Sequence, residues 1–187
     1  ESIGLALGTS FAAGLNAYAT VALLGAAQHF GFVALPSGLG ILGHPAVILA
    51  AGRGTRLAGE LTDRPKGFIR IGTRPIIEES IDRLVAAGIQ DVIVVTGHLA
   101  DYYEELARGR AGLVQTVHND RFADSGSMYS LHCARERVQG PFLLLESDLV
   151  YEPRARTTLL AGPAEDAILL SGPTGAGDEV FVATRGG

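Results

Sequence analysis

The 187-residue sequence contains one cysteine, Cys133, so it cannot form an internal disulfide. A lone thiol fits a reducing compartment, where it serves as a small apolar core residue. Because the five histidines are scattered and no second cysteine exists, no zinc-site spacing is found. Any metal must therefore be a hard cation held by carboxylate oxygens.

Positive charge is in short supply: 15 Lys and Arg residues stand against 20 Asp and Glu residues, and the net charge is −5. This balance argues against a surface that wraps nucleic acid, so we expect no nucleic-acid partner and only local roles for the basic residues. The length suits one sizeable domain with an appendage.

Charged residues are absent altogether from residues 2–52. Within this stretch, residues 3–27 are apolar and long enough to cross a bilayer as a hydrophobic helix, which takes about 20 residues. Small residues near one face of this helix suit close packing in a membrane, but an Ala/Gly-rich helix can equally be buried inside a protein. Both interpretations stay open, and membrane contact is expected only through residues 3–27.

The most informative stretch is Ala46–Lys66. Its apolar start, Ala46–Ala51, predicts a strand buried on both faces, and Gly52–Arg56 predicts a tight glycine-rich turn. Glycines let the backbone adopt positive φ and let a ligand approach bare N–H groups. Arginines in the turn and Lys66 add positive charge, so the stretch predicts a phosphate-binding loop.

Two common phosphate-binding motifs do not fit this loop. The P-loop pattern is absent, and the dinucleotide pattern needs a third glycine where the chain has Leu57. That pattern also wants an acidic residue after the second strand, which here ends in Thr96-Gly97. Residues 49–57, followed by Pro65-Lys66, instead resemble the signature of the nucleotidyltransferase superfamily.

This resemblance implies specific roles for residues around the loop. Lys66 and Arg56 would be catalytic. Three segments would bind the nucleotide. The glycine loop contributes Leu49, Ala50, Ala51, Gly52, Arg53, Gly54 and Thr55. The two walls of the base pocket are the end of the second strand, Thr96 and Gly97, and a polar turn, Ser125, Gly126 and Ser127.

The rest of the chain alternates between strand and helix patterns. Strands are predicted at 91–96, 113–117, 142–145, 167–170 and 180–183, and helices at 76–87, 100–108, 127–138 and 153–160, with an extended piece at 67–71. This alternation predicts an α/β fold with a doubly wound, mostly parallel sheet. The resemblance implies the same Rossmann-like fold of the nucleotide-diphospho-sugar transferase type.

Carboxylates end the apolar strand at 142–145, where Glu146, Ser147 and Asp148 follow. Ionised carboxylates at such an edge are costly unless they are paired or bound to a cation, although Asp148 would also suit a helix cap. In the resembling superfamily this aspartate holds Mg²⁺. We expect Asp148 to be the metal ligand, with Glu146 as a weaker candidate.

Two further stretches resemble one branch of this superfamily, the choline-phosphate and 2-aminoethylphosphonate cytidylyltransferases. Residues 119–131 carry its N-x-x-F element and polar turn, and residues 171–180 resemble the 2-aminoethylphosphonate enzymes. A cationic acceptor group would need a carboxylate or an aromatic face. The candidates are Tyr129, Tyr151, Glu152, Asp178 and Glu179, and the sequence does not rank them.

The function implied is transfer of CMP from CTP to a small amino- or choline-type phospho-compound with Mg²⁺. A sugar-1-phosphate nucleotidyltransferase of the same fold is one alternative. The other is a non-catalytic nucleotide-binding fragment, truncated at its C-terminus or membrane-anchored, because this superfamily usually supplies a second metal-binding acid from a later segment.

Residues 1–44 are similar to the N-terminus of small bacterial membrane proteins of unknown function, in which such a helix precedes a turn like Phe32–Pro36. We therefore predict a leader, residues 1–44, and a nucleotidyltransferase domain, residues 45–187. The leader is either a membrane anchor or a foreign segment joined by fusion. The catalytic domain is expected in the cytoplasm.

Overall fold

The computed structural model describes residues 44–54, 63–161, 166–170 and 172. The predicted hydrophobic helix and the predicted strand at 180–183 lie outside the described residues. The division of the chain after residue 44 therefore stays a prediction. No helix among the described residues combines the length and the apolar character needed to cross a membrane.

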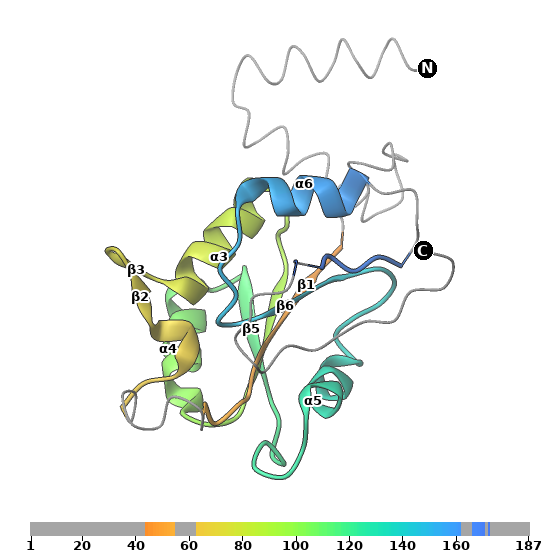
Figure 1. The fold of residues 1–187 in the computed structure, drawn as a ribbon. Coiled ribbons are helices and arrows are strands. Elements are labelled where there is room, and N and C mark those ends of the chain that lie inside the picture. Colours follow the sequence, from red (N-terminus) through yellow and green to blue (C-terminus); the bar gives the residue numbers. More distant parts are fainter. Residues whose placement is uncertain (1–43, 55–62, 162–165, 171, 173–187) are drawn as a thin grey trace.

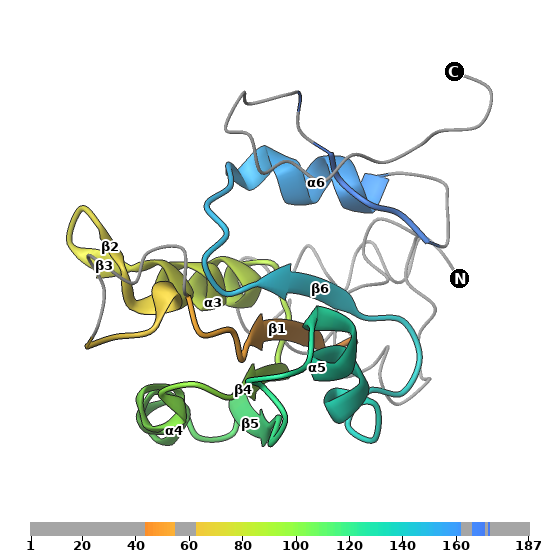
Figure 2. The ribbon, with the colours of Figure 1, turned by 60° about the horizontal axis from the view of Figure 1, so that its bottom comes forward.

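Four parallel strands form the sheet of the described part: β1 (Ala46–Ala50), β4 (Val92–Thr96), β5 (Val114–His118) and β6 (Leu143–Glu146). Figure 1 shows the fold, and Figure 2 shows the strand order β5-β4-β1-β6. In the central strand, Ala46 pairs with Val92 on one side and with Leu143 on the other. The predicted parallel α/β fold is therefore confirmed.

Helices cover both faces of this sheet, as the fully buried strands β1 and β4 require. α3 (Ile76–Ala86) and α4 (Ala100–Gly109) pack on one face, and α5 (Ser127–Ala134) packs on the other (Figure 2). The first face carries the larger apolar cluster, to which Leu159 of α6 (Pro153–Ala161) adds. Cys133 of α5 packs against the second, smaller cluster. This arrangement confirms the doubly wound architecture.

The segment between the signature loop and α3 is more compact than the extended piece predicted for residues 67–71. A short 3-10 helix, η3 (Lys66–Phe68), is followed by a two-stranded antiparallel hairpin, β2 (Arg70–Ile71) and β3 (Arg74–Pro75). The hairpin turns at Gly72, where φ is +68°. That conformation favours glycine, which explains why the chain reverses here.

Two predictions about later elements are wrong. The helix predicted for residues 127–138 ends at Ala134, because residues 135–137 continue as tight turns that bond three residues back and lead to Gly140 at φ +86°. Residues 167–170 form no strand. Their large side chains, Ile168, Leu169 and Leu170, are 71%, 47% and 53% exposed, so this apolar run pairs with no strand among the described residues.

The strand order changes direction at β1. From β1 the chain crosses to β4 and then outward to β5, and afterwards it returns to β6 on the opposite side of β1. In such sheets ligands bind beyond the carboxyl ends of the strands, where the order reverses. The fold therefore directs attention to the segments that follow β1 and β6.

Candidate active site

The start of the glycine loop is tied to both neighbouring strands. The Leu49 carbonyl accepts a hydrogen bond from the Ser147 amide at 3.0 Å, and the Ala51 carbonyl accepts one from the His98 amide at 3.3 Å. Beyond this anchored stem, Gly52 and Arg53 are exposed. The backbone of the loop is therefore held at the switch point while its tip faces solvent.

Lys66 lies between this loop and the end of β6. Its Nζ is 3.6 Å from the Asp148 carboxylate, and the two side chains are 30% and 39% exposed. Its methylene groups lie against Gly54, where an added Cβ would be 3.3 Å from Lys66 Cγ and Cε. Gly54 also has φ +65°, a conformation that side chains disfavour. The structure thus brings together the loop, the lysine and the aspartate that the sequence analysis selected.

Glu146 is the second carboxylate at this edge. Although Glu146 is exposed to solvent, partial desolvation of its carboxylate, followed by the neighbouring Asp148 carboxylate, raises the pKa of Glu146, while a hydrogen bond from Ser127 and the charge of Lys66 oppose that shift. The Ser127 hydroxyl donates to Glu146 at 3.3 Å. Glu146 therefore connects the end of β6 to the start of α5.

This pair of carboxylates fits a divalent cation. Groups of three or more potential metal ligands do not occur in the described part of the chain. Mg²⁺, however, is usually held by one or two carboxylates, with water and substrate phosphates completing its shell. Two carboxylates whose mutual repulsion raises a pKa would be stabilised by such an ion.

The end of β4, predicted as one wall of the base pocket, is occupied by protein side chains. Gly97 is buried, and a Cβ there would lie 2.5 Å from Phe122 Cβ and 2.8 Å from the Ala51 carbonyl oxygen. Thr96 is buried and its hydroxyl lies 3.3 Å from His118 Nδ1. A side chain at position 97 would therefore collide with Phe122, so glycine is needed there for packing. The nucleotide contact expected at Gly97 stays a prediction.

The polar turn before α5 is organised by Asn119, which is fully buried. Its amide group donates to the hydroxyls of Ser125 and Ser130, both at 3.0 Å, and its Oδ1 accepts from the Arg121 amide at 2.9 Å. Gly126 and Ser127 are exposed beyond this anchor. The turn is therefore held from within, and its outer residues face solvent near Glu146.

Three of the acceptor-binding candidates lie in the described part, and each already has a cationic neighbour. The guanidinium of Arg121 lies 5.1 Å from the centre of the Tyr129 ring. Glu152 pairs with Arg154 at 2.6 Å. Any cationic acceptor group would have to compete with these arginines for the same carboxylate or ring face.

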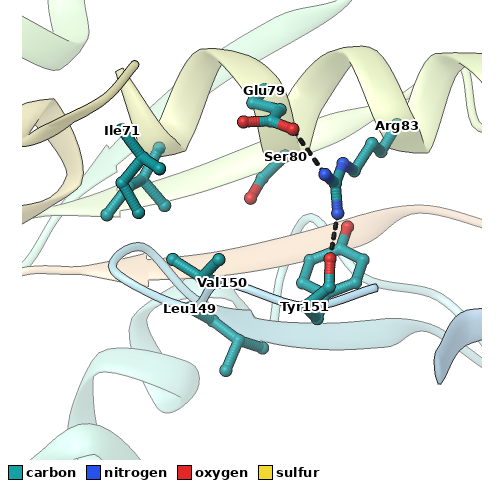
Figure 3. A pocket seen from close by; sticks show the side chains of 8 residues that line it. Ile71, Glu79, Ser80, Arg83, Leu149, Val150 and Tyr151 are labelled. Atoms are coloured by element: carbon teal, nitrogen blue, oxygen red, sulfur yellow. Dashed lines mark hydrogen bonds and ion pairs between the residues drawn. The ribbon is translucent and has the colours of Figure 1, made fainter. Parts of the chain in front are cut away.

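The third candidate, Tyr151, borders a small pocket between the hairpin, α3 and residues 149–151. Figure 3 shows Arg83 reaching from α3 to this residue, where its guanidinium donates to the Tyr151 carbonyl and also pairs with Glu79. The same guanidinium lies 5.3 Å from the centre of the Tyr151 ring. Tyr151 is therefore held against α3.

Four predicted site residues, Thr55, Arg56, Asp178 and Glu179, lie outside the described residues. Conversely, the sequence analysis missed Tyr103 and the side chain of Ser147, which lie beneath Lys66 and Asp148. The spacing of Tyr103 with Leu106 and Ala107 on α4 is that of a buried helix face. This signal predicts burial of Tyr103, but it does not predict what its hydroxyl contacts.

Comparison with known proteins identifies the domain. The model of the MobA-like NTP transferase domain matches residues 46–185. A second model, a domain of unknown function (DUF4126), matches residues 3–57, in agreement with the resemblance noted for the leader. The two matches overlap along β1 and the glycine loop.

Two curated relatives are cytidylyl-transferring enzymes by name. The CMP-5'-(3-aminopropyl)phosphonate synthase of Streptomyces rubellomurinus is 37% identical over 130 residues, which are 68% of this chain and 21% of that protein. The choline-phosphate cytidylyltransferase of Streptococcus pneumoniae is 32% identical over 114 residues, which are 61% of this chain and 49% of that protein. The chain therefore matches half or less of the length of these relatives.

A solved structure of the CTP:phosphocholine cytidylyltransferase of Streptococcus pneumoniae has the same fold. It superposes with a TM-score of 0.55 at 31% identity, over 62% of this chain and 50% of that one. The parallel sheet, the glycine loop at its switch point and the family match over residues 46–185 agree with one another. The chain belongs to the family of MobA-like NTP transferase domains.

Proposed function

We propose that this domain transfers CMP from CTP to a small phosphonate or phosphate that carries an amino or choline group, with release of pyrophosphate. The observation that carries the proposal is the convergence of Gly54, Lys66 and Asp148 at the switch point of the sheet. The likeness to a phosphonate synthase and a choline-phosphate enzyme supports CTP and this class of acceptor.

The reaction is an in-line substitution at the α-phosphorus of CTP. An oxygen of the acceptor's phosphonate or phosphate forms a bond to that phosphorus, and the bond to the bridging oxygen of the β-phosphate breaks. Pyrophosphate leaves with the electron pair of the broken bond. Because the attacking oxygen is already anionic, no general base is required, and catalysis consists of positioning and charge stabilisation.

The residues of the site divide this work between them. The exposed loop from Gly52 would hold phosphate oxygens with its backbone N–H groups. Lys66 would leave Asp148 and stabilise the charge that develops on the α-phosphate. Asp148, with Glu146 beside it, would hold Mg²⁺, and the ion would supply positive charge to neutralise the phosphate oxygens.

The direct test is pyrophosphate release by the full chain with CTP and Mg²⁺, with 2-aminoethylphosphonate and phosphocholine assayed in parallel. Release with one acceptor, lost in Asp148→Ala and kept in Asp101→Ala, would support the proposal and identify the acceptor. Asp101 is a matched control because it is an exposed aspartate on α4.

Two results would contradict the proposal. Release only with a sugar 1-phosphate and a different nucleoside triphosphate would assign the domain to sugar-nucleotide synthesis. No release with any of these pairs would leave a nucleotide-binding domain that does not catalyse the transfer.

A further inference from the structure

The residue after Lys66 and the residue before Asp148 are in close contact beneath the site. At Gly67, which is buried, an added Cβ would lie 3.1 Å from the Ser147 carbonyl oxygen and 3.2 Å from Ser147 Cβ. A side chain at this position would push both neighbours, which belong to or adjoin the backbone, away by a few tenths of an ångström, so glycine favours the close approach. The two functional side chains therefore extend from backbone segments that touch each other.

Tyr103 of α4 lies at this junction. Its hydroxyl would be 3.1 Å from a Cβ at Gly67, beside the Ser147 carbonyl oxygen and Cβ at 3.1 Å and 3.2 Å. The Ser147 side chain and the Gly67 backbone are the hydrogen-bonding groups that oppose the effect of burial on the pKa of Tyr103. The residue is 1% exposed, and its ring packs edge-on against Phe68 at 5.2 Å between centroids. Burial raises the pKa of Tyr103 to about 12, so the hydroxyl stays neutral at physiological pH.

We propose that Tyr103 is a positioning residue whose hydroxyl holds Gly67 against Ser147 and thereby fixes Lys66 relative to Asp148. The inference rests on the proposed function, in which these two side chains face the α-phosphate and the metal. Tyr103 itself is buried beneath the site and touches no substrate.

Lys66 and Asp148 need such an anchor because their side chains are partly exposed. Lys66 and Asp148 are each about one-third exposed, so their own packing leaves them several rotamers. The backbones that carry them belong to a short 3-10 helix and to the end of an edge strand of the described sheet. A buried hydroxyl that lies against both segments restricts their separation. Small misplacements at a phosphoryl-transfer site can cost about 10²-fold in rate.

The experiment compares Tyr103→Phe with Tyr102→Phe in the full chain. Tyr102 is a matched control because it is the adjacent residue, its ring also packs on Phe68 at 5.2 Å, and its hydroxyl donates to the Asp63 carbonyl at 2.7 Å on the exposed side. We expect kcat to fall about tenfold in Tyr103→Phe while KM for CTP changes less than about threefold. Tyr102→Phe should leave both unchanged.

Ser147→Ala tests the same link from its other end and leaves the Tyr103 ring in the core. It should lower kcat by a similar factor, and the double variant should be no slower than the slower single variant, because both changes break one linkage. Additive losses would overturn the inference. Should Tyr103→Phe fail to fold, the Ser147→Ala result decides.

Amide hydrogen exchange at Gly67, followed by NMR, is a readout that needs no turnover. Exchange should accelerate in Tyr103→Phe and in Ser147→Ala but not in Tyr102→Phe. Unchanged Gly67 exchange together with wild-type kcat would overturn the inference. If the wild-type protein releases no pyrophosphate, the proposed function fails, and the exchange rates alone decide whether Tyr103 holds this junction.

Discussion

Lys66 Nζ lies 3.6 Å from the carboxylate of Asp148, so the cation expected to meet phosphate is paired with the anion expected to hold metal. The pair is partly exposed, and its net contribution to stability is therefore small, at most about 1 kcal/mol. A metal–nucleotide complex supplies a better partner for each side chain at once. We therefore expect the metal to strengthen binding of the nucleotide, and the nucleotide to strengthen binding of the metal.

Replacing Lys66 should affect turnover more than nucleotide binding. We expect Lys66→Ala to lower kcat by about 10²–10³, by analogy with the loss of one donor to a developing charge. KM for CTP should change far less. Arg64→Ala is the control, because Arg64 is an exposed cation two residues away that pairs with Asp63 at 3.2 Å. Equal losses in kcat and CTP binding would contradict the role given to Lys66.

Chemical labelling tests the same residue without turnover, since Lys66 is the only lysine in the 187-residue sequence. An amine-directed reagent should therefore modify Lys66 and the N-terminal amine alone. CTP with Mg²⁺, at ten times its Kd, should slow labelling of Lys66 about tenfold by mass action and should leave the N-terminal amine unaffected. Equal labelling rates with and without saturating CTP would show that the nucleotide does not cover Lys66.

Glu146→Gln should raise the thermal stability of the metal-free protein in a pH-dependent way. Partial desolvation and the Asp148 carboxylate raise the pKa of Glu146 above its ordinary value of 4.5, so folding favours the protonated form. The destabilisation is absent below about pH 4.5 and develops as pH rises through the raised folded-state pKa. Glutamine has no charge and can still accept from Ser127.

Thermal melts at pH 4 and pH 8 would measure this effect. The Tm of Glu146→Gln should exceed that of the wild-type protein at pH 8 and equal it at pH 4. Glu136→Gln, which changes a 78% exposed carboxylate paired with Arg135, is the control and should show no such trend. A Glu146→Gln variant that is less stable at pH 8 would contradict the assigned direction.

Asn119→Ala should destabilise the fold by about 2–4 kcal/mol, because it removes three hydrogen bonds and leaves the buried Ser130 hydroxyl without this partner. Urea unfolding measures the loss. Asp120→Ala, at the exposed neighbouring position, should change stability by less than about 0.5 kcal/mol. Similar midpoints for Asn119→Ala and the wild-type protein would show that the turn before α5 is held by other contacts.

The sequence predicted the sheet and its helices well where apolar runs are long and bounded by glycine or proline. β1 and β4 are continuous apolar runs buried on both faces, and α3 carries its apolar residues at helical spacing. Apolar composition gives a wrong prediction at residues 167–170, where the structure has no strand. That run is as apolar as a buried strand, but in the structure it is exposed and pairs with no strand among the described residues, so apolar composition alone does not determine its conformation.

The arrangement of the candidate site is predictable only in outline. Parallel strands bring the segments after β1 and β6 to one edge, so a meeting of the glycine loop with Asp148 follows from topology. The junction of Gly67, Tyr103 and Ser147 does not follow, because it depends on how three separate segments pack. The sequence also does not predict that Phe122 packs against Gly97, and the nucleotide contact expected at Gly97 stays a prediction.

The central place of β1 has a consequence for biosynthesis. Its first edge is completed by β4, but its second edge pairs with Leu143 and its neighbours, about a hundred positions later in the chain. Pairings so distant in sequence form slowly, because a long loop must close before they contribute. During translation, one edge of β1 therefore stays unpaired until β6 has been synthesised. Nascent chains that end before β6 are expected to aggregate most readily.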